Sequence, residues 1–228
     1  MTCSKFVKLK IDMKKIAIIL GLIGVTVFSC TEKKIEEVVE KSAIETQISQ
    51  EEPSDMIDGI VKVATVKWTG FKTTEKIAVS GTFDAVQVLD AKEGNTPQEI
   101  LQGAKVRVPV TSIDSGLEER DTKLKMILFG SMLNTSDIFG VLNFKDGKTY
   151  IKFTLNDVSK EYEVQSNFQN NIFTIKTTIN LDDFKANAAV EALNKACFDL
   201  HTGADGVSKT WSEVDIEGTV EFAKELGK

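Results

Sequence analysis

The sequence is poor in the residues that carry most enzyme chemistry. It has a single histidine, His201, in 228 residues, which excludes a histidine-based metal cluster and a second catalytic imidazole. It also lacks a G-x-S-x-G motif and a glycine-rich phosphate loop. Asp182 and Asp183 are adjacent acids on an expected turn, where carboxylates are usually solvated. We therefore predict a protein that is not an enzyme, with no metal and no cofactor.

Cysteine is scarce and unevenly placed. Of the three cysteines, Cys3 and Cys30 lie within the first thirty residues, which leaves Cys197 alone in the rest of the chain. A disulfide within the folded part is therefore excluded. Cys197 follows the apolar-rich stretch AVEALNKA, so we predict a small buried hydrophobic residue and not a reactive thiol.

Basic residues are outnumbered by acidic ones. The chain has 28 Lys and Arg against 34 Asp and Glu, a formal net charge of −6. Without residues 1–29 the counts become 23 and 33, and the charge becomes −10. Because nucleic acid demands clustered Lys and Arg, we expect no nucleic-acid partner.

The apolar run near the start of the chain is too short to span a bilayer comfortably. In MKKIAIILGLIGVTVFSC, which begins at Met13, two lysines precede fourteen almost wholly apolar residues, whereas a membrane-spanning helix needs roughly 20. A positive flank, a short apolar run and a small residue before the end are typical of a secretory signal peptide. We assign this signal to residues 1–29, with Met13 as the natural start and residues 1–12 as an upstream mis-start.

The last residues of this run, Val27 to Cys30, resemble the bacterial lipobox, in which the cysteine thiol is acylated before cleavage. The resemblance implies that acylated Cys30 becomes the first residue of the mature chain and attaches it to the membrane. Several acyl chains suffice for stable attachment, whereas one would be marginal. We expect the protein in the cell envelope, lipid-anchored at the periplasmic face or in the outer membrane.

Residues 30–55 are predicted to be the lipidated N-terminus and an acidic tether. Residues 31–55 carry eight acids, three bases and no aromatic residue, which is typical of a solvated spacer. Ile35, Val38 and Val39 fall at helical spacing, so a short amphipathic or partner-binding helix is the alternative.

Beyond Met56 the sequence changes to short runs in which apolar and polar residues alternate, the pattern of strands with one apolar face. Three short helices, over 96–103, 118–130 and 183–198, lie between these runs and give no regular alternation of strand and helix. Eight antiparallel strands with one apolar face can close into a barrel, which removes the sheet edges. The eight runs lie near residues 60–71, 76–86, 105–113, 138–145, 149–156, 161–168, 172–181 and 211–222.

The segment SIDSGLEERDTKLKMILFG, residues 112–130, resembles the signature of the YceI-like family. Members carry a strand ending in S-I-D-[TS]-G, an R-D pair, here Arg120 and Asp121, and a helix with L-K and a phenylalanine near its end. VKWTGF, SGTFDAV, INLDDF and WSEVDIEGTVEF support the match, which covers roughly residues 60–223. Many members have histidine shortly after the R-D pair, where this chain has Thr122 and Lys123.

The resemblance implies a mainly β fold over residues 56–228, an eight-stranded antiparallel lipocalin-like barrel with two or three short helices and an elongated apolar cavity. Better-known members bind polyisoprenoid chains or other amphiphiles there. We therefore expect a polyisoprenoid, a quinone or another amphiphilic lipid as the partner, held for storage or transport. The residues expected to bind this ligand are Val66, Trp68, Val79, Phe83, Val106, Val108, Phe153, Phe173, Ile175, Ile216 and Val220.

Two questions stay open at the level of sequence. A barrel of eight strands is wide enough either to fill with side chains or to hold one small ligand, so the alternative is a ligand-free surface or periplasmic protein-interaction module with a solid barrel. The sequence also leaves open a homodimer. For Arg120 and Asp121 we favour a local clamp on the Asp114–Gly116 turn over contact with a ligand head group.

Overall fold

The computed structural model describes residues 60–226. The predicted signal peptide (1–29), Cys30 and the acidic tether (30–55) lie outside the described residues. Within the described range, no helix is both long enough and apolar enough to cross a membrane.

The described residues form one antiparallel sheet of ten strands with a few short helices, so the predicted mainly β fold is confirmed. In sheet order, the strands are β3-β4-β6-β7-β8-β9-β10-β1-β2-β5. Their bounds are β1 Val61–Lys72, β2 Ile77–Phe83, β3 Gln87–Leu89, β4 Lys105–Pro109, β5 Ile113–Asp114, β6 Asp137–Lys145, β7 Lys148–Leu155, β8 Val158–Gln169, β9 Ile172–Asn180 and β10 Thr210–Phe222.

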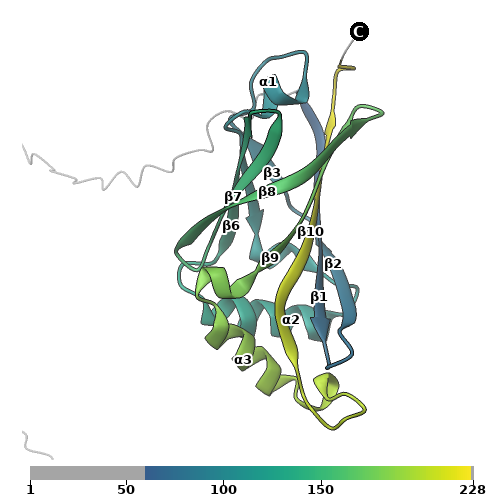
Figure 1. Cartoon of the computed structure of the whole chain (residues 1–228), viewed down its shortest axis with the longest axis vertical. Helices are drawn as coiled ribbons and strands as arrows, with labels where there is room; N and C mark the ends of the chain where they lie inside the picture. Colours follow the sequence, from purple (N-terminus) through teal and green to yellow (C-terminus); the bar gives the residue numbers. More distant parts are fainter. Residues whose placement is uncertain (1–59, 227–228) are drawn as a thin grey trace, which may run out of the picture. The chain divides into compact units, whose positions relative to one another are not determined.

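The sheet closes on itself through one bent segment. β4 pairs with β6, and β5, only a few residues further along the same segment, pairs with β2 at the other end of the sheet order. Between them, the 3₁₀ turn Val110–Ser112 follows Pro109, whose nitrogen has no hydrogen to donate to a ladder. Segment 105–114 thus pairs near both ends of the sheet order, β4 with β3 and β6 and β5 with β2, and this double pairing closes the sheet (Figure 1).

The structure has ten strands where eight were expected, because a turn divides the predicted run 105–113 and because the short strand β3 lies just beyond the end of the predicted run 76–86. Residues 84–86 separate β2 from β3, and the turn at 110–112 separates β4 from β5. Counted as chain segments, the barrel still has eight, each paired with the next and β10 paired with β1.

Two-residue turns explain why β6 to β9 pair in sequence order. These turns are Asp146-Gly147, Asn156-Asp157 and Asn170-Asn171, and φ is positive at both residues of each, between 52° and 73°. Such turns match the right-handed twist of the strands they join, and Asn, Asp and Gly are the residues that tolerate this backbone. Each consecutive pair of strands is therefore set by local chemistry.

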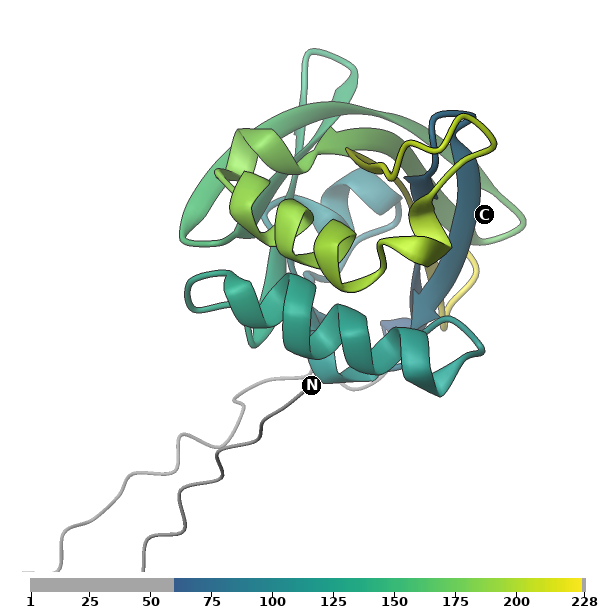
Figure 2. The same ribbon diagram turned by 90° about the horizontal axis from the view of Figure 1, so that it is seen from below.

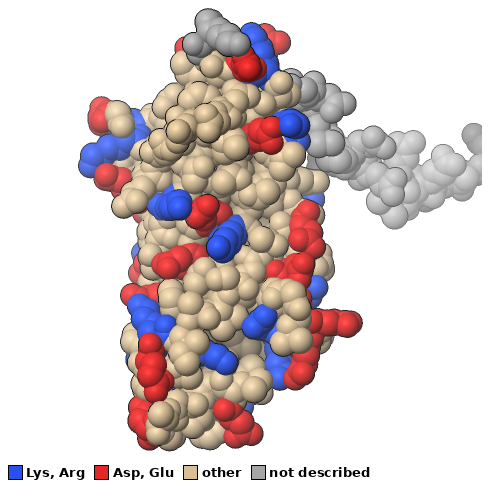
Figure 3. Space-filling view, turned by 90° about the vertical axis from the view of Figure 1, so that its right-hand side faces the viewer, with Lys and Arg blue, Asp and Glu red and all other residues tan. Residues whose placement is uncertain are grey.

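Alternation along the strands separates an apolar interior from a charged exterior. In β7, Ile151, Phe153 and Leu155 are buried, while Lys152 between them is exposed. On the outer surface, Lys and Arg are interspersed with Asp and Glu (Figure 3). Cross-strand ion pairs join Lys62 to Glu221 at 2.7 Å, Lys148 to Glu163 at 2.8 Å and Lys176 to Glu217 at 2.9 Å.

Helical segments lie at the two ends of the barrel. α1 (Pro97–Leu101) begins at Thr96, whose hydroxyl accepts a hydrogen bond from the Glu99 N–H at 3.2 Å. At the opposite end, α2 (Glu118–Lys123) and α3 (Asn187–Ala196) lie across the barrel opening (Figures 1 and 2). The helix predicted over 118–130 is three pieces, because α2 widens into a π-helical turn over Leu124–Leu128 and ends in a 3₁₀ turn.

The R-D pair forms the predicted clamp. One carboxylate oxygen of buried Asp121 accepts hydrogen bonds from the backbone N–H and the hydroxyl of Ser115, at 2.9 and 2.5 Å. Arg120 donates to the hydroxyl and the carbonyl of the same serine, at 2.7 and 2.8 Å. These bonds tie α2 to the residue that follows β5, the strand that closes the barrel.

Candidate ligand cavity

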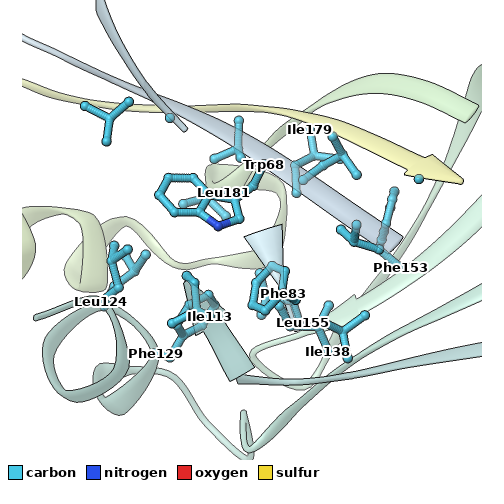
Figure 4. A pocket seen from close by; sticks show the side chains of 18 of the residues that line it. Trp68, Phe83, Ile113, Leu124, Phe129, Ile138, Phe153, Leu155, Ile179 and Leu181 are labelled. Atoms are coloured by element: carbon cyan, nitrogen blue, oxygen red, sulfur yellow. The ribbon is translucent and has the colours of Figure 1, made fainter. Parts of the chain in front are cut away.

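The inward faces of the strands enclose a cavity of about 450 Å³. This volume falls within the roughly 300–1,000 Å³ of small-molecule sites. Apolar side chains from strands all around the barrel surround the space, including Trp68, Phe83 and Phe153 (Figure 4). The interior is therefore not solid, and the question that the sequence left open is answered in favour of a cavity.

All eleven residues that the sequence predicts as ligand contacts line this cavity. They come from six strands, because every second residue of each strand faces inward. The set is Val66 and Trp68 on β1, Val79 and Phe83 on β2, Val106 and Val108 on β4, Phe153 on β7, Phe173 and Ile175 on β9, and Ile216 and Val220 on β10. That these side chains contact a ligand stays a prediction.

The helical end of the cavity was missed by the sequence analysis. Leu124, Leu128 and Phe129 lie on the segment after α2, and Val190 and Leu193 lie on α3. Their helical spacing gives each segment an apolar face, and the segment after α2 and helix α3 both turn that face toward the cavity. Sequence spacing alone does not say what such a face covers.

Cys197 is one of the residues at this end, and it is buried as predicted. Burial raises the pKa of its thiol, and nearby Lys123 only partly opposes that shift. The thiol is thus protonated at neutral pH, so it serves as a small apolar wall residue.

Charged and polar groups gather at the same end. Lys72 donates to the carbonyl of Leu200 at 3.0 Å, and Lys123 pairs with Glu119 at 2.7 Å. Lys72, Lys123 and Glu119 all line the cavity, together with Arg120. Within residues 60–226, no carboxylate lies within ion-pair distance of Lys72.

His201 lines the cavity beside these groups. Its Nδ1 lies 2.6 Å from the hydroxyl of Thr210, which itself donates to the Asn194 side chain at 2.9 Å. Because the Thr210 hydrogen is committed to Asn194, the Thr210 oxygen accepts from Nδ1–H, and Nε2 is the nitrogen that can take up a proton. In the described part of the chain, no cluster of three or more His, Cys, Asp or Glu side chains is placed to hold a metal ion.

Fold and cavity together define a small closed antiparallel barrel that encloses one apolar pocket. The family model of the YceI-like domain matches residues 42–222, so the chain belongs to the YceI-like family. No curated protein matches this chain.

Solved structures with this fold are similar to it. A polyisoprenoid binding domain from Saccharophagus degradans, implicated in plant cell wall breakdown, is 12% identical with a TM-score of 0.51, and the match covers 70% of this chain and 93% of that one. BcnA of Burkholderia cenocepacia is 14% identical with a TM-score of 0.46, over 69% and 94% of the two chains. At 12% identity, the likeness to the Saccharophagus degradans domain concerns the fold alone.

The single histidine gives a prediction on pH. Burial, with Lys72 and Lys123 nearby, lowers the pKa of His201 below its usual 6.5. As the pH falls past 6.5, the unfolded chain takes up a proton before the folded one does, so the free energy of unfolding decreases until the folded pKa is passed. Denaturant unfolding between pH 5 and 7.5 measures the free energy of unfolding. NMR titration of the His201 imidazole measures its pKa in the folded protein.

His201→Gln is the matched variant, because glutamine keeps a polar side chain but does not titrate. We expect it to remove the decrease in stability that begins near pH 6.5. An imidazole pKa at or above 6.5 in the folded protein would contradict the prediction.

Proposed function

We propose that this protein holds an isoprenoid or a similar amphiphilic lipid in the barrel cavity, for storage or transport in the cell envelope. The observation that carries the proposal is the 450 Å³ cavity, whose strand walls are almost wholly apolar. The fold of a Saccharophagus degradans domain described as polyisoprenoid binding adds support.

The energetics favour a hydrocarbon ligand. Each buried methylene is worth roughly 0.8 kcal/mol, so the fifteen carbons of three isoprene units would contribute roughly 12 kcal/mol by the same measure. Association costs about 4 to 15 kcal/mol in lost freedom. A chain of this length can therefore bind without a strong polar contact, which fits a wall with few polar groups.

Aspartate in the wall should abolish most of this binding. Phe83 and Phe153 are 7% and 8% exposed and line the cavity from opposite parts of the sheet. We expect saturable binding of a prenyl quinone to delipidated protein, and at least a roughly tenfold weaker affinity for Phe83→Asp or Phe153→Asp. The reason is that an unpaired carboxylate in apolar surroundings costs well over the 1.4 kcal/mol that a tenfold change represents.

Met126→Asp is the matched control, because Met126 is 72% exposed and does not line the cavity. It should bind like the unchanged protein. Circular dichroism confirms that each variant is folded before titration. Equal affinity of the wall variants and the control would rule out the cavity as the binding site.

We also propose that acylated Cys30 anchors the domain to the membrane. The support is the order of residues before it: two lysines, fourteen almost wholly apolar residues and the lipobox-like Val27 to Cys30. Residues 31–55 then separate the lipid from the barrel domain.

Cys30→Ser removes the acylated thiol and tests the anchor. In a bacterial host, the unchanged protein should be found in the membrane fraction, with a mass that corresponds to a chain starting at Cys30 plus acyl groups. The serine variant cannot be acylated, and because acylation precedes cleavage, its mass should correspond to an uncleaved chain without acyl groups. Recovery of the unchanged chain without acyl groups, and outside the membrane fraction, would contradict the anchor.

A further inference from the structure

The cavity opens to solvent at its helical end. Leu117, just before α2, and Leu200, in the 3₁₀ turn Asp199–His201, both line the cavity, yet they are 52% and 60% exposed. A side chain that lines a cavity and is also more than half exposed marks the mouth of that cavity. Figure 2 shows this end from below, with the segment that leads into α2 and the connection from α3 to β10 on the near side.

Further apolar side chains lie at the same end. Phe198, which follows α3, and Ile77, the first residue of β2, are both at least half exposed. Ile77 shares the inner face of β2 with Val79, which lines the cavity, because every second residue of a strand faces the same way. We call Ile77, Leu117, Phe198 and Leu200 the apolar rim. It continues the apolar surface of the cavity out to solvent.

The opposite end of the barrel is better covered. There α1 packs its buried residues Ile100 and Leu101 into the core. Phe168 and Ile172, on either side of the turn between β8 and β9, are little more than a third exposed. The ring of Phe168 packs edge-on against Phe222 at 6.1 Å. The two ends therefore differ, and the more exposed apolar side chains lie where the cavity opens.

Charged groups beside the rim neutralise one another. Lys76 pairs with Glu213, and Lys123 pairs with Glu119 at 2.7 Å. Pairing of this kind leaves little net charge to attract a polyanion or a strongly charged protein. Exposed apolar side chains around an apolar mouth suit the hydrocarbon region of a lipid bilayer instead.

Trp211 and two lysines form a cluster beside the rim that is typical of a membrane surface. The Nζ atoms of Lys209 and Lys76 lie 3.4 and 4.8 Å from the centre of the indole ring, and the indole N–H donates to the Thr73 carbonyl at 2.8 Å. Indole rings are enriched at the boundary between hydrocarbon and head groups. Lysine can keep its charge among head groups while its stem lies on apolar surface.

The chain that precedes the barrel is long enough to let the rim face a membrane. β1 begins at Val61, at the end opposite to the rim, and its twelve residues span roughly 40 Å (Figure 1). Residues 31–60 reach at most roughly 100 Å when extended. Acylated Cys30, as proposed above, would thus hold the domain near a bilayer and still let its far end turn toward that bilayer.

We propose that the apolar rim inserts into the surface of a phospholipid bilayer, so that the mouth of the cavity opens onto its hydrocarbon. A lipid then passes between the bilayer and the cavity without crossing water. Docking of this kind goes beyond the proposed function, because it requires no particular ligand.

Binding to vesicles tests the docking. Residues 30–228 with Cys30→Ser, produced without the signal peptide and so without acyl groups, are mixed with phosphatidylcholine vesicles and separated by flotation. We expect similar binding at ~50 and ~500 mM salt, because apolar contacts are not screened as exposed charges are. Phe198→Asp in this chain should weaken binding at least roughly tenfold, since a buried phenylalanine side chain contributes a factor of that size or more.

Val63→Asp is the matched control, because it places the same charge at an exposed apolar position of β1 near the opposite end. It should float like the parent chain, and circular dichroism confirms that both variants are folded. Equal binding of the two variants, or no flotation of the parent chain, would overturn the inference. Self-association without vesicles that Phe198→Asp abolishes would assign the rim to contact between copies and overturn it as well.

The affinity for a prenyl quinone separates docking from ligand binding. Phe198 does not line the cavity, so Phe198→Asp should keep the quinone affinity of the parent chain but take up quinone from vesicles more slowly, in proportion to its weaker docking. If quinone binds and the parent chain does not float, docking fails and the lipid-binding function stands. Flotation without quinone binding would support docking and remove the proposed function.

Discussion

Closure of the sheet by the bent segment 105–114 is the constraint on which the cavity depends. One half of this segment pairs with β6 and the other half pairs with β2, so the ten strands enclose an interior instead of forming an open layer. Asp121 and Arg120 hold the end of the segment through Ser115. Without that closure, the apolar faces of the strands would have no common interior to line.

The same closure creates a cost that a ligand can relieve. Side chains around an empty apolar space lose the dispersion contacts that a packed core would provide, and cavities lower stability in proportion to their volume. A lipid that fills the space restores those contacts, and any ligand that binds only the folded state stabilises it.

Alternation in the sequence was enough to predict the wall of the cavity but not its existence. Residues such as Val106 and Val108 on β4 could be placed on the inner face because the period of a strand is two. Whether large residues such as Phe153 meet across the interior or leave a gap depends on barrel geometry, which no local pattern encodes. The break at 110–112, the π-helical turn at Leu124–Leu128 and the cover formed by α3 are likewise set by tertiary contacts.

Native mass spectrometry of the protein purified from its own host tests the central claim most directly, because it shows what occupies the barrel in the cell. The account predicts a noncovalent lipid of one molecule per chain, which leaves on collisional activation and has the mass of an isoprenoid or a related amphiphile. A population that consists only of ligand-free chains, prepared without delipidation, would contradict it.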